Sequence, residues 1–213
     1  MQYISLNNEF NCENKTKQKN IDVYKILKRI IDIIIASILI IILLPIIILV
    51  SISIKLDSKG PIIFKQLRTG LNSEDFYIYK FRTMIVGCPS VPTCQIKEKG
   101  CQVTRIGKFL RKTSLDEIPQ LYNILKGEMS FVGPRPVINT ELKLINLRQE
   151  CGVDRLYPGI TGWAQINGRD ELSIYKKLEY DYEYYKNKSL LFDIYIMFKT
   201  VLKVVKAEGI KED

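Results

Sequence analysis

The sequence predicts an α+β protein that is predominantly helical and is held at a membrane by an N-terminal helix. Three observations predict this class: an almost wholly apolar run over residues 30–54, short apolar runs around a glycine turn near residue 70, and apolar residues at helical spacing near the C-terminus. We divide the chain into a flexible polar tail (1–23), a membrane-embedded helix (24–58) and a domain with amphipathic helices (59–213).

The composition limits the chemistry that this chain can perform. It contains no histidine, which excludes Ser-His-Asp and Cys-His catalysis and histidine-ligated zinc. A metal would therefore be a hard cation on carboxylates, such as Mg²⁺. The net charge of +9 favours an anionic partner, for which nucleic acid, anionic lipid head groups and a phosphorylated substrate are candidates. No CxxC pair occurs, and we expect reduced structural cysteines rather than metal ligands.

The apolar run contains Asp32 as its only charge and is long enough to cross a bilayer, for which about 20 residues suffice. Basic residues stand on both sides of the run, and positive flanks prefer the cytosol. Pro45 removes a backbone donor and kinks the helix. The part before Pro45 would rise roughly 22 Å, which is less than the hydrocarbon core of roughly 30 Å. These features favour a re-entrant helix with both ends cytosolic over a kinked single-pass helix.

Short strands and ordered loops are expected after the membrane run. Residues 62–64 and 76–79 are predicted as strands around the turn at 70–72. The segments 132–136 and 158–168 hold most of the remaining proline and glycine, and we predict that they are ordered loops.

Two helical regions are expected in the same domain. Residues 105–127 are predicted as helix, interrupted near Pro119. Close to the C-terminus, apolar residues recur at three- and four-residue spacing and lysines gather on another face, which predicts an amphipathic helix. Such a helix either packs on the core or lies at the membrane interface.

Two adjacent carboxylates, Asp116 and Glu117, follow two cations and precede a proline. Because proline is tolerated in the first turn of a helix, a helix would begin near Asp116. The unpaired N–H groups there would favour the ionised carboxylate that a nucleophile or Mg²⁺ ligand requires. The alternative is structural, since Ser114 and Glu117 match a capping box and Asp116 could be a plain N-cap.

Two further positions have more than one interpretation. Arg135 stands between two prolines, and a rigid backbone around an arginine suits bidentate recognition of phosphate. The alternative is a turn that exposes a solvated arginine. Trp163, the only tryptophan, either stacks on a base or fills the core.

Taken together and in this order, the motifs resemble one family, the monotopic phosphoglycosyl transferases or bacterial sugar transferases. The chain resembles the small form of the family, because no second hydrophobic block precedes residue 30. The motifs are Lys28-Arg29-Ile30-Ile31-Asp32, Tyr79-Lys80-Phe81-Arg82-Thr83-Met84, Thr104-Arg105-Ile106-Gly107, Ser114-Leu115-Asp116-Glu117, Pro119-Gln120-Leu121-Tyr122-Asn123, Gly133-Pro134-Arg135-Pro136 and Pro158-Gly159-Ile160-Thr161-Gly162-Trp163.

The resemblance implies transfer of a phosphosugar from a UDP-sugar to a polyprenyl phosphate, with UMP released, at the cytosolic face of a bacterial membrane. It implies Mg²⁺ and a covalent phosphosugar on Asp116. Glu117 would assist with metal or proton handling, and both carboxylates would hold the metal. The phosphate charge would be held by Lys80, Arg111 and Arg135. The implied fold is a re-entrant helix, interfacial helices and a small cytosolic catalytic domain.

Two rival interpretations can be compared with this one. A single-pass anchored protein whose basic domain binds anionic lipid or nucleic acid would give Asp116 no role. Interleaved basic and aromatic residues at 175–188 are consistent with it, but no nucleic-acid motif is present. A glycosidase needs opposed carboxylates across a sugar, which neighbours on one turn do not provide.

Overall fold

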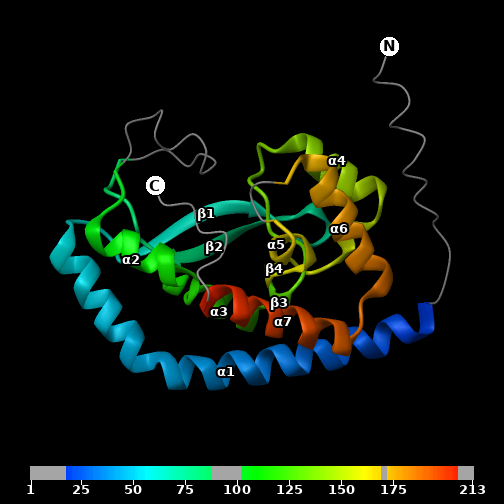
Figure 1. Cartoon of the computed structure of the whole chain (residues 1–213), viewed down its shortest axis with the longest axis horizontal. Coiled ribbons are helices and arrows are strands. Elements are labelled where there is room, and N and C mark those ends of the chain that lie inside the picture. Colours follow the sequence, from blue (N-terminus) through cyan, green and yellow to red (C-terminus); the bar gives the residue numbers. More distant parts are fainter. Residues whose placement is uncertain (1–17, 88–101, 169–171, 206–213) are drawn as a thin grey trace, which may run out of the picture.

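The computed structural model describes residues 18–87, 102–168 and 172–205 of the chain. Within these ranges the protein is mostly helical and contains two small two-stranded sheets, which confirms the predicted α+β class. Figure 1 shows helix α1 (Gln18–Asp57) running along one side of the molecule, with the other elements on its other side. The division into 1–23, 24–58 and 59–213 stays a prediction.

Among the described helices, α1 is the one long and apolar enough to cross a membrane. Pro45 lies inside it, and Figure 1 shows that α1 bends in its second half, as expected where proline removes a backbone hydrogen bond. Ala36, Val50 and Ile54 are buried against the rest of the protein. Isoleucine and leucine side chains cover the opposite, exposed face of α1, among them Ile41, which is 73% exposed.

Polar contacts tie the first part of α1 to the rest of the protein. The ammonium group of Lys28 lies 2.7 Å from the Asp193 carboxylate, in an ion pair that is largely buried. The Tyr24 hydroxyl donates to the same carboxylate at 2.9 Å. The Arg29 guanidinium donates to two backbone carbonyls at the end of helix α3 (Gln120–Lys126).

The end of α1 is tied to the same body. The Asp57 carboxylate accepts a hydrogen bond of 3.0 Å from the backbone N–H of Ile106, near the start of helix α2 (Arg105–Thr113). The Arg82 guanidinium donates to the carbonyls of Ser58 and Lys59, just past the last turn of α1. These carbonyls have no partner inside the helix, so Arg82 satisfies groups that would otherwise need water.

The predicted hairpin is present and its strands are longer than expected. Strands β1 (Ile63–Thr69) and β2 (Asp75–Phe81) pair antiparallel around the 3-10 turn η2 (Leu71–Ser73). Helix α2 ends at Ser114, whose φ of 56° is left-handed, and the turn η4 (Leu115–Glu117) and α3 follow. The predicted interruption near Pro119 is confirmed, since α3 begins directly after this residue, and the break starts earlier, at Ser114, because a left-handed residue cannot continue a right-handed helix.

A second sheet, in which β3 (Ser130–Val132) and β4 (Gly159–Thr161) run parallel, reaches into both segments predicted as loops. The prediction is wrong for most of 158–168, which holds β4 and the short helix α5 (Trp163–Ile166). Glycines allow these backbones to meet: a Cβ on Gly133 would lie 2.1 Å from the Tyr157 carbonyl, and one on Gly162 would lie 2.1 Å from the Gly133 carbonyl. No side chain fits in that space, which explains why both motifs require glycine.

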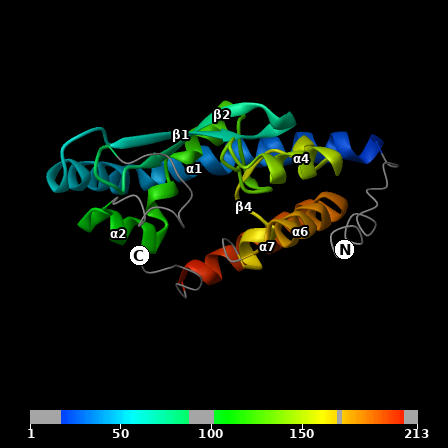
Figure 2. The same cartoon turned by 90° about the horizontal axis from the view of Figure 1, so that it is seen from above.

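The remaining elements are helical. They are α4 (Leu142–Glu150), η5 (Val153–Arg155), α5 (Trp163–Ile166), α6 (Ile174–Asn187) and α7 (Leu190–Val205). Seen from above in Figure 2, α6 and α7 lie on the opposite side of the molecule from the hairpin.

Two predictions about single residues can be compared with the structure. Trp163 packs edge-on against Tyr180 and Phe192, and its indole N–H donates to Glu183 at 2.7 Å, which agrees with a structural role. The prediction of reduced cysteines is wrong for Cys151, which is disulfide-bonded; the other cysteines lie outside the described residues. The positions of the cysteines in the sequence gave no information about this disulfide.

Candidate active site

The two adjacent carboxylates lie on the single turn η4 between α2 and α3. Leu115 and Ile118, on either side of them, pack into a hydrophobic cluster that contains the fully buried Leu110. The turn is therefore fixed by its neighbours. Asp116 is 9% exposed, so its carboxylate is largely shielded from water.

The structure brings two of the predicted phosphate-binding cations to these carboxylates. Lys80, on β2, places its ammonium group 2.7 Å from a Glu117 oxygen and 3.9 Å from an Asp116 oxygen. Arg135, which follows β3, places its guanidinium 3.5 Å from the same Glu117 oxygen. Residues from three separate segments thus meet in one charged cluster, and 42% of the Arg135 side chain stays exposed to solvent.

Arg111, the third predicted cation, lies in the last turn of α2. Its Nε donates to the Thr83 hydroxyl at 3.1 Å. Its positive charge is close enough to lower the pKa of Asp116. We therefore place Arg111 at the edge of the cluster, oriented by Thr83, a residue that the sequence analysis did not single out although it belongs to the Lys80-Phe81-Arg82-Thr83 motif.

The structure holds Asp116 in a different way from the one that the sequence predicts. Ser114 makes no side-chain cap hydrogen bond, so the proposed capping box is absent. The expectation that a helix N-terminus favours ionisation is also wrong, because η4 is a single 3-10 turn. Burial raises the pKa of the Asp116 carboxyl above its usual range; the charge of Lys80 acts against this, and that of Glu117 adds to it. The nearby cations, rather than a helix dipole, favour the charged form.

Three side chains of the motif at the end of β2 make three different contacts. Lys80 binds the carboxylates, Arg82 binds the end of α1, and Thr83 binds Arg111. The Thr83 carbonyl also lies 2.1 Å from where a Cβ on Gly107 would stand, so this glycine lets the start of α2 approach the strand. One short segment therefore links α1 to the charged cluster.

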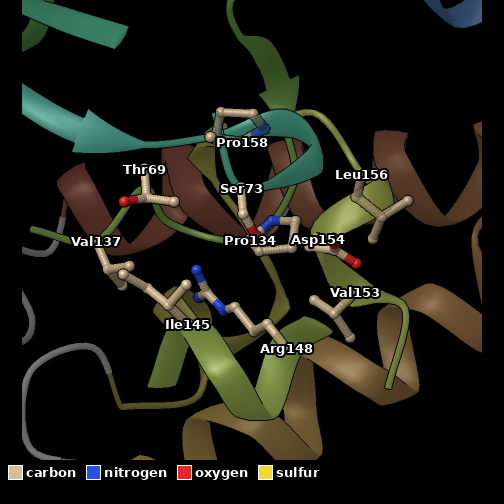
Figure 3. A pocket seen from close by; sticks show the side chains of 11 residues that line it. Thr69, Ser73, Pro134, Val137, Ile145, Arg148, Val153, Asp154, Leu156 and Pro158 are labelled. Atoms are coloured by element: carbon tan, nitrogen blue, oxygen red, sulfur yellow. The ribbon is translucent and has the colours of Figure 1, made fainter. Parts of the chain in front are cut away.

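The backbone at Arg135 is held by a buried ion pair between α4 and α6. Arg148 donates Nε and Nη2 to one Asp181 oxygen at 3.1 and 2.6 Å, and it donates Nη1 to the Arg135 carbonyl at 2.9 Å. Figure 3 shows Arg148 among the side chains that line a small hollow with Pro134. The sequence analysis missed Arg148, since its partner is 33 residues away and no local motif marks it.

The dyad offers oxygen donors for a metal ion. Asp116 and Glu117 supply the hard oxygen atoms that Mg²⁺ prefers. The described residues hold no group of three or more His, Cys, Asp or Glu side chains that could hold a metal ion. Phosphate oxygens and water would have to complete the coordination, as is usual for Mg²⁺. A buried carboxylate surrounded by cations is thus suited to chemistry at a phosphorus atom, with or without a metal bridging to the substrate.

Comparison with known proteins agrees with this geometry. Residues 23–207 match the family described as bacterial sugar transferase. The uncharacterized sugar transferase EpsL of Bacillus subtilis is 43% identical over 188 residues, which cover 88% of this chain and 91% of EpsL.

Two longer relatives carry substrate names. The UDP-glucose:undecaprenyl-phosphate glucose-1-phosphate transferase of Escherichia coli is 40% identical over 188 residues, which cover 85% of this chain and 40% of that protein. The UDP-N-acetylgalactosamine-undecaprenyl-phosphate N-acetylgalactosaminephosphotransferase of Aeromonas hydrophila is 38% identical over 194 residues, which cover 88% of this chain and 45% of that protein. The chain thus spans less than half the length of these two relatives.

Proposed function

Because the chain belongs to the bacterial sugar transferase family, we propose that it transfers a phosphosugar from a UDP-sugar to a polyprenyl phosphate, giving a polyprenyl diphosphosugar and UMP. The names of the E. coli and A. hydrophila relatives support both substrates. The observation that carries the proposal is the buried Asp116 beside Glu117, with Lys80 and Arg135 within ion-pair distance of this carboxylate pair.

The first step would be attack by an Asp116 carboxylate oxygen on the phosphorus atom that carries the sugar. A bond forms between that oxygen and phosphorus, and the bond from phosphorus to the bridging oxygen breaks. UMP leaves with the electron pair of the broken bond. The cations Lys80, Arg111 and Arg135 would hold the substrate phosphates and reduce the repulsion between two anions.

The second step would regenerate the carboxylate. A phosphate oxygen of the polyprenyl phosphate attacks the same phosphorus atom, and the acyl phosphate bond to Asp116 breaks. Splitting the transfer into two displacements lets one cluster of cations serve both. Glu117 already accepts from Lys80 at 2.7 Å, so its role would be to orient this ammonium group and to help hold the metal.

We propose Mg²⁺ as the cofactor, held by Asp116 and Glu117 together with the substrate diphosphate. When bound, it would neutralise charge on the diphosphate before the nucleophile approaches. The hard carboxylate oxygens of the dyad fit this ion.

The contacts of α1 support a re-entrant geometry, with the domain and both termini in the cytosol. One body binds α1 from Tyr24 near its start to Asp57 at its end. A helix perpendicular to the membrane would draw this body, with its charged cluster, into the hydrocarbon. A bent helix that dips into one leaflet keeps the body outside, because the exposed isoleucine face alone enters lipid.

Helix α7 has the burial pattern expected of an interfacial helix. Its buried face carries Asp193 and Ile196, which are 4% and 0% exposed. Its exposed face carries Leu191, Phe198 and Val201, each at least 60% exposed. Phe192 and Met197 pack with Ile196 in a core cluster, so α7 has one apolar face on the core and a second apolar face exposed. A helix of a soluble protein would carry polar side chains on that second face, and we therefore place it at the membrane surface beside α1.

Replacement of Asp116 by asparagine tests the reaction. We expect Asp116→Asn to abolish UMP release, because an amide cannot form the acyl phosphate. Burial raises the pKa of Asp116, so ionisation costs folding stability near neutral pH; the neutral amide should melt at the same temperature or higher. With labelled UDP-sugar and no acceptor, label should remain on the wild type and be absent from the variant. Glu117→Gln should retain more activity than Asp116→Asn, because Glu117 has a supporting role. The non-enzymatic alternative requires that Asp116→Asn changes nothing.

A further inference from the structure

The first turns of α1 form one wall of a second hollow, which neither Asp116 nor Glu117 lines. Lys25, Arg29 and Arg155 line it, and none of the described residues lining it is acidic. Ile26 and Ile30 line it as well, and they are 60% and 49% exposed. The hollow therefore combines positive charge with an apolar wall.

A further cation adds to this charge. The Lys188 ammonium group lies over the Tyr185 ring, 4.0 Å from its centroid. Burial lowers the pKa of Lys188, and the nearby charge of Lys25 lowers it further. The Tyr185 hydroxyl and Arg155 both lie beside Gly152. Lys188 thus lies close enough to Lys25, which lines the hollow, for their charges to interact.

Within the part of the chain that the structure describes, no carboxylate forms an ion pair with Lys25, Arg29 or Arg155. Arg29 donates to two backbone carbonyls of α3, and its net charge remains. Lys25 and Arg155 are exposed. Like charges held together repel one another, so an anion bound between them would relieve this repulsion.

The hollow is distinct from the candidate active site. Leu71 and Asn72, at the tip of the hairpin, line it. Lys80 lies five residues into β2 from Asp75 at the hairpin end, which corresponds to about 17 Å along an extended strand. Of the described residues that line the hollow, none belongs to the charged cluster of Lys80, Asp116, Glu117 and Arg135.

We propose that this hollow binds the phosphodiester headgroup of an anionic phospholipid in the leaflet that holds α1. Lys25, Arg29 and Arg155 would surround the phosphate, and the acyl chains would follow the isoleucines of α1. Charge complementarity and the continuity of Ile26 and Ile30 with the exposed apolar face of α1 favour a lipid over a soluble anion. The proposal depends on membrane association of α1 and not on the transfer reaction.

The test is thermal unfolding of the full chain in neutral detergent, titrated with phosphatidylglycerol, phosphatidylcholine, polyprenyl phosphate or inorganic phosphate. Phosphatidylglycerol should raise the melting temperature, and phosphatidylcholine and inorganic phosphate should not. Lys25→Gln with Arg155→Gln should raise the concentration of phosphatidylglycerol that gives a set stabilisation by more than tenfold, since each basic residue contributes about fivefold to affinity near anionic lipid. Arg155→Gln alone should raise this concentration by about fivefold.

Lys143→Gln with Lys186→Gln is the matched control, because it removes the same charge from exposed sites outside the hollow and should leave the response unchanged. Asp116→Asn should be stabilised by phosphatidylglycerol as the wild type is. Lipid binding can then be confirmed or refuted independently of the transfer reaction. An equal response in the Lys25 and Arg155 variants would overturn the proposal. Stabilisation by polyprenyl phosphate alone, or equally by inorganic phosphate, would also overturn it.

Discussion

The ion pair between Arg148 and Asp181 allows stability and activity to be separated. The two side chains are 10% and 2% exposed, and the remaining guanidinium nitrogen donates to the Arg135 carbonyl at 2.9 Å. Arg148→Met would leave the Asp181 carboxylate buried without its cation. Removing one partner of a buried pair costs about 3–5 kcal/mol of folding free energy. We therefore expect a large fall in melting temperature.

The loss should depend on pH in a defined direction. Burial raises the pKa of Asp181 and the Arg148 charge lowers it, so removing Arg148 raises it further. A carboxyl whose pKa is higher in the folded state than in the unfolded state loses stability as pH rises through the folded value. Arg148→Met should therefore be less destabilised at acidic pH, where Asp181 takes up a proton, than at neutral pH.

The double variant Arg148→Met with Asp181→Leu distinguishes support of the fold from positioning of Arg135. It removes both charges, and replacing a buried pair by apolar side chains is often neutral or stabilising, so we expect most of the stability to return. The Arg135 carbonyl still lacks its donor. A small displacement of a substrate-binding group costs up to about a hundredfold in rate, and we expect UMP release to stay at least tenfold lower. Recovery of both properties would refute a positioning role for Arg148.

Three further predictions concern the metal, the charged cluster and the membrane helix. Excess EDTA should stop UMP release and added Mg²⁺ should restore it; full turnover in EDTA would contradict the proposed cofactor. Lys80→Met removes a charge that lowers the pKa of Asp116, so the acid limb of the kcat/KM profile should move to higher pH, and an unmoved limb would show that Lys80 does not act on Asp116. Pro45→Leu should straighten α1 and favour spanning, which would make a cysteine introduced near residue 10 reactive from outside intact cells; the same cysteine should stay protected when Pro45 is kept.

The sequence predicted the parts of the fold that short-range signals determine. The strands on either side of residues 70–72 are present because a turn and apolar runs specify a hairpin locally. The β3–β4 sheet was missed, since three-residue parallel strands are too short for alternation to be visible. Their prolines and glycines indicated loops, whereas Gly133 and Gly162 in fact allow two backbones to come into contact.

The sequence predicted which residues would form the candidate site, but not the contacts between them. The resemblance to a family selected Asp116, Glu117 and three cations, and the structure places two of these cations, Lys80 and Arg135, beside the carboxylates. Arg148 had no such signal, because its contacts join α4 to α6 and to the Arg135 loop through space. Motifs identify residues that touch a substrate more readily than residues that hold those residues in place.

The protonation state of Asp116 shows why chemistry cannot be read from neighbours in the sequence alone. Local reasoning assigned it a helix N-terminus, which would favour the anion. In the structure burial disfavours the anion, and Lys80, from another element, is the strongest opposing influence. If Asp116 is the nucleophile, its reactivity then depends on the packing of β2 against η4 and on the phosphates and metal that bind beside it. An ion pair that already occupies Lys80 with Glu117 would have to rearrange when substrate phosphate arrives, and this rearrangement would couple substrate binding to the ionisation of the nucleophile.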